Sequence, residues 1–196
     1  MMQSETVKEA DLNILALVGS PRVGGNTDFL ADQALEEAAR LGAQTEKIIL
    51  SEHKVAPCLG HDDCGSFETC VQKDDTSWIL DKFCEADGVI LATPVYYYNA
   101  SAQLKAFMDR NYFLYMHNRK SKAKAVGIIV VAESQGIEDT VHTLKRYINE
   151  SFNVPKDKIL ELHGYAYELG EAKNDPQLVE RAREFGRKIV NSLTEK

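Results

Sequence analysis

Apolar and polar positions follow two alternating patterns along the chain. Short apolar-rich runs occupy residues 12–18, 45–50, 88–93, 123–132 and 159–169, as is typical of strands that are buried on both faces. After each run, apolar residues recur every three or four positions, as on one face of a helix, in the stretches 26–41, 74–85, 100–112, 137–152 and 176–193. This alternation predicts an α/β fold with a five-stranded parallel sheet and helices on both faces. Right-handed crossovers make a doubly wound sheet of order 2-1-3-4-5 the natural arrangement.

Residues that cap helices or break strands set the expected boundaries of these elements. Asn26 or Thr27 is expected to be the N-cap of the first helix, because short polar side chains accept hydrogen bonds from first-turn N–H groups. Asp74 or Asp75 is expected to start the second helix in the same way. Pro94 is expected to end the third strand.

Length and composition are those of one soluble domain. The chain has 196 residues, of which 44% are apolar and 27% charged, and this length suits a single α/β domain rather than two. Residues 1–10 are expected to form a frayed leader, and residues 55–73 an irregular insert that contains three cysteines.

Charge and hydropathy exclude several kinds of partner. The net charge of −7 argues against a nucleic-acid partner, which usually requires a basic stripe. No apolar run approaches the roughly 20 residues that span a bilayer, so we expect no membrane partner. The polar, acidic N-terminal stretch does not have the form of a signal peptide, and we expect a cytoplasmic protein. In that reducing compartment the four cysteines point to metal or redox chemistry rather than to disulfides.

The loop after the first strand has the composition of an anion site. It joins a buried strand to a helix start, where unpaired N–H groups and the helix dipole favour negative charge. It lacks the Lys-Ser/Thr ending of an ATP-binding P-loop and the GxGxxG spacing of a dinucleotide fold. A purely structural turn is the alternative. The candidate anion-binding residues are Ser20, Arg22, Gly25, Asn26 and Thr27.

Three blocks in a fixed order carry a resemblance to a known family. They are GSPRVGGNT at 19–27, the cysteine insert at 55–73, and DGVILATPVYYYNASAQLKAFMDR at 87–110. Over most of residues 12–136 the chain resembles the NADPH-dependent FMN reductase family, and most of all its iron–sulfur flavoprotein branch. The resemblance implies a flavodoxin-like fold with non-covalently bound FMN. It also implies that the first loop holds the 5′-phosphate of FMN.

The resemblance places the isoalloxazine ring of FMN against the loop that leaves the third strand. Backbone amides and aromatic faces there suit a flat ring, although three adjacent tyrosines also fit simple packing. A second polar loop follows the fourth strand at the same sheet edge; it lacks the Gly-Gly pair that family members commonly have, and Glu133 at its start is expected to be solvated. The candidate ring-binding residues are Thr93, Pro94, Val95, Tyr96, Tyr97 and Asn99 in the first of these loops, and Ser134, Gln135 and Gly136 in the second.

The insert contains Cys58, His61, Cys64 and Cys70. By resemblance to the iron–sulfur flavoproteins, these four positions match a run of four cysteines, with His61 replacing the second. Three interpretations remain open: a four-iron cluster with one imidazole ligand, a Cys3His zinc site, and a loop with free cysteines. Because imidazole is a weaker ligand for iron than thiolate, we predict that His61 prevents a stable cluster under aerobic purification.

The predicted function is that of an FMN-dependent oxidoreductase. NAD(P)H would reduce the flavin, which would then reduce free flavin, a quinone, a nitro or azo compound, or a redox protein. No catalytic side chain is named, since the flavin itself accepts hydride. The alternatives are a non-enzymatic electron carrier of flavodoxin or iron–sulfur flavoprotein type, and a protein that keeps the fold without flavin. An apolar and aromatic stretch fits either packing in the core or a subunit interface, which is often rich in such residues; it consists of Leu104, Phe107, Met108, Tyr112, Phe113 and Tyr115. By resemblance to relatives with this helix, we expect a homodimer or homotetramer that uses the interface.

Overall fold

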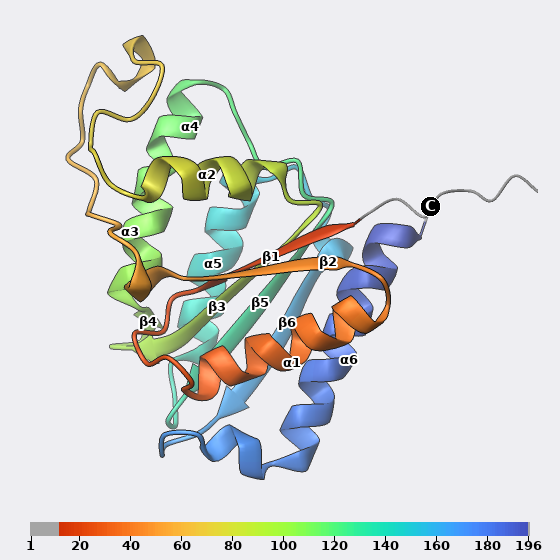
Figure 1. The fold of residues 1–196 in the computed structure, drawn as a ribbon. Coiled ribbons are helices and arrows are strands. Elements are labelled where there is room, and N and C mark those ends of the chain that lie inside the picture. The colour runs from red at the N-terminus through yellow and green to blue at the C-terminus, as the bar shows by residue number, and fades with distance from the viewer. Residues whose placement is uncertain (1–11, 196) are drawn as a thin grey trace, which may run out of the picture.

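The computed structural model describes residues 12–195, which fold around a parallel β-sheet (Figure 1). Its strands lie in the order β2-β1-β3-β5-β6. Counted along the chain, this is the predicted order 2-1-3-4-5, and the predicted doubly wound fold is confirmed. The predicted leader at residues 1–10 lies outside the described residues. The parallel strands are β1 (Asn13–Val18), β2 (Gln44–Ile49), β3 (Gly88–Tyr96), β5 (Ala125–Ala132) and β6 (Ile159–Tyr165).

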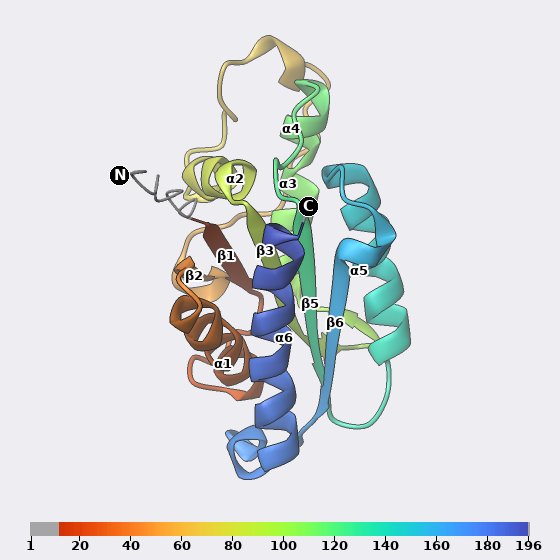
Figure 2. The same ribbon diagram turned by 90° about the vertical axis from the view of Figure 1, so that its right-hand side faces the viewer.

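Helices cover both faces of the sheet (Figures 1 and 2). One face packs against α1 (Asn26–Arg40) and α6 (Pro176–Thr194). The other face packs against four helices, α2 (Thr76–Glu85), α3 (Ala102–Arg110), α4 (Tyr112–Met116) and α5 (Ile137–Ser151). Within residues 12–195, no helix combines the length and the apolar character needed to cross a membrane.

Alternate residues of the central strands enter two separate cores. In β3, Val89 and Leu91 pack in the core under α2 and α3, whereas Ile90 and Ala92 pack in the core under α1 and α6. Because a strand between two helical layers is buried on both sides, its sequence is apolar at every position. This is why the strands of the sheet's centre could be recognised as continuous apolar runs.

The end of the third strand differs from the prediction. β3 continues through Pro94 to Tyr96 and then turns back into a two-residue antiparallel strand, β4 (Asn99–Ala100). The prediction that Pro94 ends this strand is therefore wrong. β1 already ends at Val18, opposite Ala92, so Pro94 lies where β3 has a free edge on that side, and a missing N–H costs no ladder bond there.

Two helix boundaries also differ. The N-cap of α1 is Gly25, in extended conformation, rather than Asn26 or Thr27. The single helix predicted over 100–112 is two helices, which meet at Asn111. Asp75 is the N-cap of α2, as predicted. Boundary residues such as these depend on tertiary contacts that apolar periodicity does not report.

Candidate functional site

A cavity of about 560 Å³ lies beyond the carboxyl ends of β1, β3, β5 and β6. In doubly wound sheets this edge is where ligands bind, because the loops that follow neighbouring strands converge there. Seven residues predicted from two separate loops line the cavity: Ser20, Arg22, Asn26, Thr27, Pro94, Val95 and Tyr96. The fold thus brings the predicted anion loop and part of the predicted ring loop to one place.

The first loop is held in shape by hydrogen bonds that its backbone N–H groups donate. The N–H of Gly25 donates to the carbonyl of Arg22 at 3.0 Å, and the N–H of Arg22 donates to Oγ of Ser20 at 3.2 Å. Gly24 has a φ of 71°, which favours glycine. A Cβ at Gly25 would lie 2.8 Å from the Arg22 carbonyl oxygen, so the turn also requires glycine there.

The start of α1 provides the polar groups for an anion. Among the described residues, no side chain caps this helix, so its first-turn N–H groups are left for another acceptor. Arg22 is exposed and is the one cation among the described residues that line the cavity, beside Glu133 and Glu168. Uncapped helical N–H groups next to an arginine form an arrangement that binds phosphate.

Asn26 has a structural role in addition to its place on the cavity wall. Its Nδ2 donates to the carbonyl of Glu168 at 2.8 Å, and its Oδ1 accepts from the N–H of Ala172 at 3.0 Å. The side chain therefore ties the start of α1 to the loop after β6. A side-chain contact from Asn26 to a phosphate, which stays a prediction, would have to share these bonds.

The predicted ring-loop residues divide into two groups. Pro94, Val95 and Tyr96 line the cavity, whereas Thr93, Tyr97 and Asn99 do not. Buried Thr93 accepts from the N–H of Ser101 at 3.0 Å and donates to the carbonyl of Pro94 at 2.9 Å, so it folds the hairpin.

Two predicted residues at the turn of the hairpin are not among the residues that line the cavity. Tyr97 is 100% exposed at the turn, and it and Tyr98 have φ values of 49° and 62°. Positive φ is uncommon for bulky residues. The amide of Asn99 donates to Oγ1 of Thr143 at 3.3 Å, so this side chain joins the hairpin to α5.

The loop after β5 supports the cavity more than it lines it. Ser134 and Gln135 are exposed and are not among the lining residues. Gly136 has a φ of 88°, and a Cβ there would lie 2.8 Å from Cγ1 of Val95. Gly136 therefore lets this loop pack closely against the hairpin that carries Val95. Glu133, expected to be solvated, is exposed but also lines the cavity.

One wall of the cavity was missed from the sequence. It comes from the loop after β6 and consists of Ala166, Tyr167, Glu168 and Leu169. The last strand was predicted to run through residue 169, and these residues were therefore assigned to the sheet. β6 ends at Tyr165. The left-handed Gly170, with a φ of 79°, was the available signal that a turn begins near this point.

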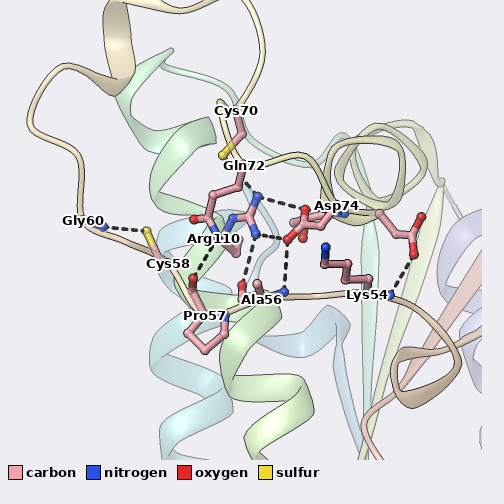
Figure 3. Close-up of polar contacts among 11 residues, drawn as sticks. Lys54, Ala56, Pro57, Cys58, Gly60, Cys70, Gln72, Asp74 and Arg110 are labelled. Atoms are coloured by element: carbon pink, nitrogen blue, oxygen red, sulfur yellow. Dashed lines mark hydrogen bonds and ion pairs between the residues drawn. The ribbon is translucent and has the colours of Figure 1, made fainter.

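The insert closes on Arg110, the last residue of α3 (Figure 3). The guanidinium is buried and forms two bonds to Asp74, Nη1 to Oδ2 at 2.6 Å and Nη2 to Oδ1 at 3.2 Å. Nη1 also donates to the carbonyl of Ala56 at 3.1 Å, and Nη2 to Sγ of Cys70 at 3.1 Å. Burial opposes the charge on Asp74, but the hydrogen bonds from Arg110, Ala56 and Thr76 together outweigh it and hold the pKa of Asp74 below its usual value. One arginine thus joins both ends of the insert.

The predicted metal ligands do not converge. Cys64 is buried, and burial together with the neighbouring Cys70 and Cys58 raises the pKa of its thiol. Within residues 12–195, however, no three His, Cys, Asp or Glu side chains meet as a metal site. In this arrangement Cys70 accepts from Arg110, and His61 would offer an imidazole where four thiolates are the usual ligand set of a four-iron cluster. Metal binding by the insert stays a prediction.

The predicted interface residues also divide into two groups. Leu104, Phe107 and Phe113 are buried in this chain's own core and are therefore not available to a partner surface. Tyr112 and Tyr115 are exposed and stacked, with ring centroids 6.2 Å apart. With Met108 they line a second cavity, of about 730 Å³, between α4 and the end of α5. Of the predicted interface residues, Tyr112 and Tyr115 are thus the ones exposed for a subunit contact.

Comparison with known proteins identifies similar chains. The family described as NADPH-dependent FMN reductase matches residues 12–160. An iron–sulfur flavoprotein from Methanocaldococcus jannaschii is 35% identical over 188 residues, covering 91% of this chain and 96% of the relative. Among solved structures, an NADH:FMN oxidoreductase in apo form has a TM-score of 0.66 at 20% identity, covering 94% of this chain and 91% of that one. A flavodoxin from the domain Archaea has a TM-score of 0.60 at 11% identity, covering 94% and 100%. The fold is flavodoxin-like.

Proposed function

This chain belongs to the NADPH-dependent FMN reductase family and is an FMN-dependent oxidoreductase, and from that premise we propose that it holds FMN non-covalently in the cavity at the carboxyl edge of the sheet. Through this FMN it passes electrons from NAD(P)H to an acceptor. Free flavin, a quinone, a nitro or azo compound and a redox protein are the acceptor classes. The working unit is a cytoplasmic homodimer or homotetramer of single-domain chains that meet through the surface of Tyr112 and Tyr115.

The observation that carries the proposal is the start of α1 within the cavity. The uncapped first turn and Arg22 would bind a ligand that carries a terminal phosphate more tightly than one that lacks it. Ser20 and Thr27 add hydroxyl groups at the same wall. The loop has this shape through its own hydrogen bonds, so little ordering is needed when a phosphate binds.

The remaining walls suit a flat, largely apolar ring. Val95 and Tyr96 lie on the hairpin side, and Tyr167 and Leu169 on the side of the loop after β6. A volume of about 560 Å³ is within the usual range for cofactor sites. Both sets of residues come from loops that the sheet and Asn26 fix in place.

FMN, when bound, supplies the redox chemistry, because its ring accepts hydride from a reduced nicotinamide and later gives up two electrons. This chain's residues bind and orient that group. Arg22 and the first turn of α1 would hold the phosphate end, and Val95 and Tyr96 of the hairpin would lie at the ring end. No side chain of the cavity is assigned as a general acid or base.

The proposal is tested by anaerobic spectroscopy of the purified chain. FMN uptake should give a flavin absorption band, and NADPH or NADH should bleach it in a stoichiometric reaction. A protein that binds FMN but is not bleached by either nicotinamide would be an electron carrier of flavodoxin type. A protein that takes up no FMN would overturn the assignment of the cavity.

A further inference from the structure

Asp28, in the first turn of α1, is a carboxylate buried beside the proposed phosphate site. It is only 2% exposed, and it follows Thr27, which lines the cavity. Its Oδ2 accepts from the N–H of Gly24 at 2.7 Å, and its Oδ1 accepts from Nζ of Lys47 at 2.6 Å. The first contact fixes the turn of the loop between β1 and α1. The second brings a cation from β2 to the same carboxylate.

Lys47 is shared between two carboxylates one turn apart on α1. Its Nζ also lies 2.6 Å from Oδ1 of Asp32, whose side chain is 41% exposed. Burial disfavours the charge on Lys47, but its hydrogen bonds to Asp28 and Asp32 outweigh that effect and raise its pKa above the ordinary value. Lys47 is therefore charged at neutral pH.

A negative charge in the first turn of a helix normally competes with an anionic ligand for the same positive end of the dipole. At this position, however, the carboxylate is useful, because it accepts the hydrogen bond from Gly24 and so shapes the loop. Lys47 offsets the charge of Asp28 while leaving that hydrogen bond in place. The molecule thus separates the hydrogen-bonding role of Asp28 from its electrostatic effect.

We infer that Asp28 and Lys47 are a charge-balanced positioning pair that sets how tightly the first loop binds the phosphate of FMN, without either side chain touching it. The inference rests on the proposed function, because it needs a phosphate at the start of α1. Lys47, which lies on β2, would thus affect the affinity for FMN through its contact with Asp28. Neither residue was recognised from the sequence.

Two substitutions separate the charge of the pair from its hydrogen bond. Asp28→Asn keeps an oxygen that accepts from Gly24 but removes the negative charge, so FMN should bind about three- to tenfold more tightly. Lys47→Met keeps an apolar stem and leaves the Asp28 charge unbalanced, so FMN should bind weaker by about the same factor. The double variant Asp28→Asn/Lys47→Met should return close to the wild-type affinity.

The measurement is a fluorescence titration of each apoprotein with FMN and with riboflavin, which lacks the phosphate. The affinity for FMN should change and that for riboflavin should not, because the pair acts on the phosphate. The ratio of the two affinities therefore reports the effect. Asp32→Asn is the matched control, because it removes a carboxylate that contacts the same lysine. Asp32 lies a turn further from the loop and is partly exposed, so the FMN-to-riboflavin ratio should change less than about twofold.

The outcomes separate this inference from the proposed function. Wild-type apoprotein that binds no FMN would overturn the proposed function itself. FMN binding with an unchanged or lower FMN-to-riboflavin ratio in Asp28→Asn would overturn the inference alone. A double variant weaker for FMN than Lys47→Met would do the same. If Lys47→Met does not fold, the FMN-to-riboflavin ratio of Asp28→Asn still decides the question when it is compared with the ratios of the wild type and of Asp32→Asn.

Discussion

The loop between β1 and α1 and the cysteine insert both carry residue types that suggest a ligand, yet only in the loop are these residues brought together. In the loop, the strand, the turn and the helix start fix the geometry within a few residues, from Ser20 to Thr27. In the insert, Cys58 and Cys70 lie on irregular backbone and Cys64 begins only a three-residue 3-10 helix, Cys64–Ser66. The main fixed point is Arg110, which belongs to α3. A site built on regular elements has its groups placed by the fold, whereas a site on an insert depends on a distant partner.

The two regions also differ in how they use charge. The loop leaves Arg22 exposed toward the cavity, where it is available to a ligand. The insert buries Arg110 completely and uses its donors on Asp74, Ala56 and Cys70. The first arginine is therefore placed for binding, and the second for holding two chain segments together. The predictions below test this difference.

The largest expected change is in the metal content of the insert. After aerobic purification the wild-type protein should retain no stable cluster. His61→Cys, reconstituted with iron and sulfide, should load about four irons per chain, because four thiolates are the usual ligand set. Iron and sulfide analysis measures the result. His61→Ser is the control, since it removes the imidazole without adding a thiolate. A full cluster in the wild type would contradict this view of the insert.

Arg110→Met should strongly destabilise the protein. It leaves the buried carboxylate of Asp74 without its partner, and breaking a buried pair in this way costs about 3–5 kcal/mol. Chemical denaturation gives the free energy of unfolding. Lys105→Met is the matched control on the same helix, because its pair with Asp109 is half exposed and worth about 0.2–1 kcal/mol. A similar loss in both variants would contradict the assigned role of Arg110.

The same pair predicts a pH dependence. The pKa of Asp74 is lowered by folding, so its stabilising contribution is present above the ordinary carboxyl pKa and is lost as the pH falls through the lowered value. Wild-type stability should therefore fall on acidification below about pH 4, and Asp74→Asn should show a shallower fall in that range. If the free energies of unfolding of the two proteins fall in parallel with pH, this contribution of Asp74 is contradicted.

Arg22→Ala should weaken FMN binding by about 1.5–3 kcal/mol, the value of a charge-assisted hydrogen bond. Riboflavin binding should change little, because the lost contact is to the phosphate. Titration of the apoprotein with both flavins measures the difference. Arg181→Ala, which removes an exposed arginine on α6, serves as the control. Equal losses for FMN and riboflavin would mean that Arg22 supports the cavity without contacting the phosphate.

Tyr97→Gly is expected to have the smallest effect, and to be stabilising. A tyrosine with a φ of 49° carries a cost of about 1–2 kcal/mol, which glycine avoids, although glycine loses part of that gain through its greater freedom in the unfolded chain. The flavin spectrum should stay unchanged, since Tyr97 does not line the cavity, whereas Tyr96→Ala should shift it. A spectral change in Tyr97→Gly alone would place this side chain over the ring.

Much of the fold could be predicted from the sequence, because buried strands and amphipathic helices leave direct periodic signals. The order of the parallel strands followed from them, and so did the position of the Arg22 loop between a strand and a helix. The loop at Tyr96 was predicted from the family resemblance. The turn at Tyr97 and Tyr98 could not be predicted, since a hairpin of this kind usually has Asn-Gly or similar residues. Arg110 was also missed, because its partners Ala56, Cys70 and Asp74 are more than 35 residues away along the chain.

The central claim is that the cavity recognises FMN through its phosphate, and one measurement tests it directly. Isothermal titration of the wild-type apoprotein with FMN and then with riboflavin gives both dissociation constants under the same conditions. The account predicts that FMN binds at least about tenfold more tightly, which corresponds to about 1.4 kcal/mol from the phosphate site. Equal affinities for FMN and riboflavin would contradict it.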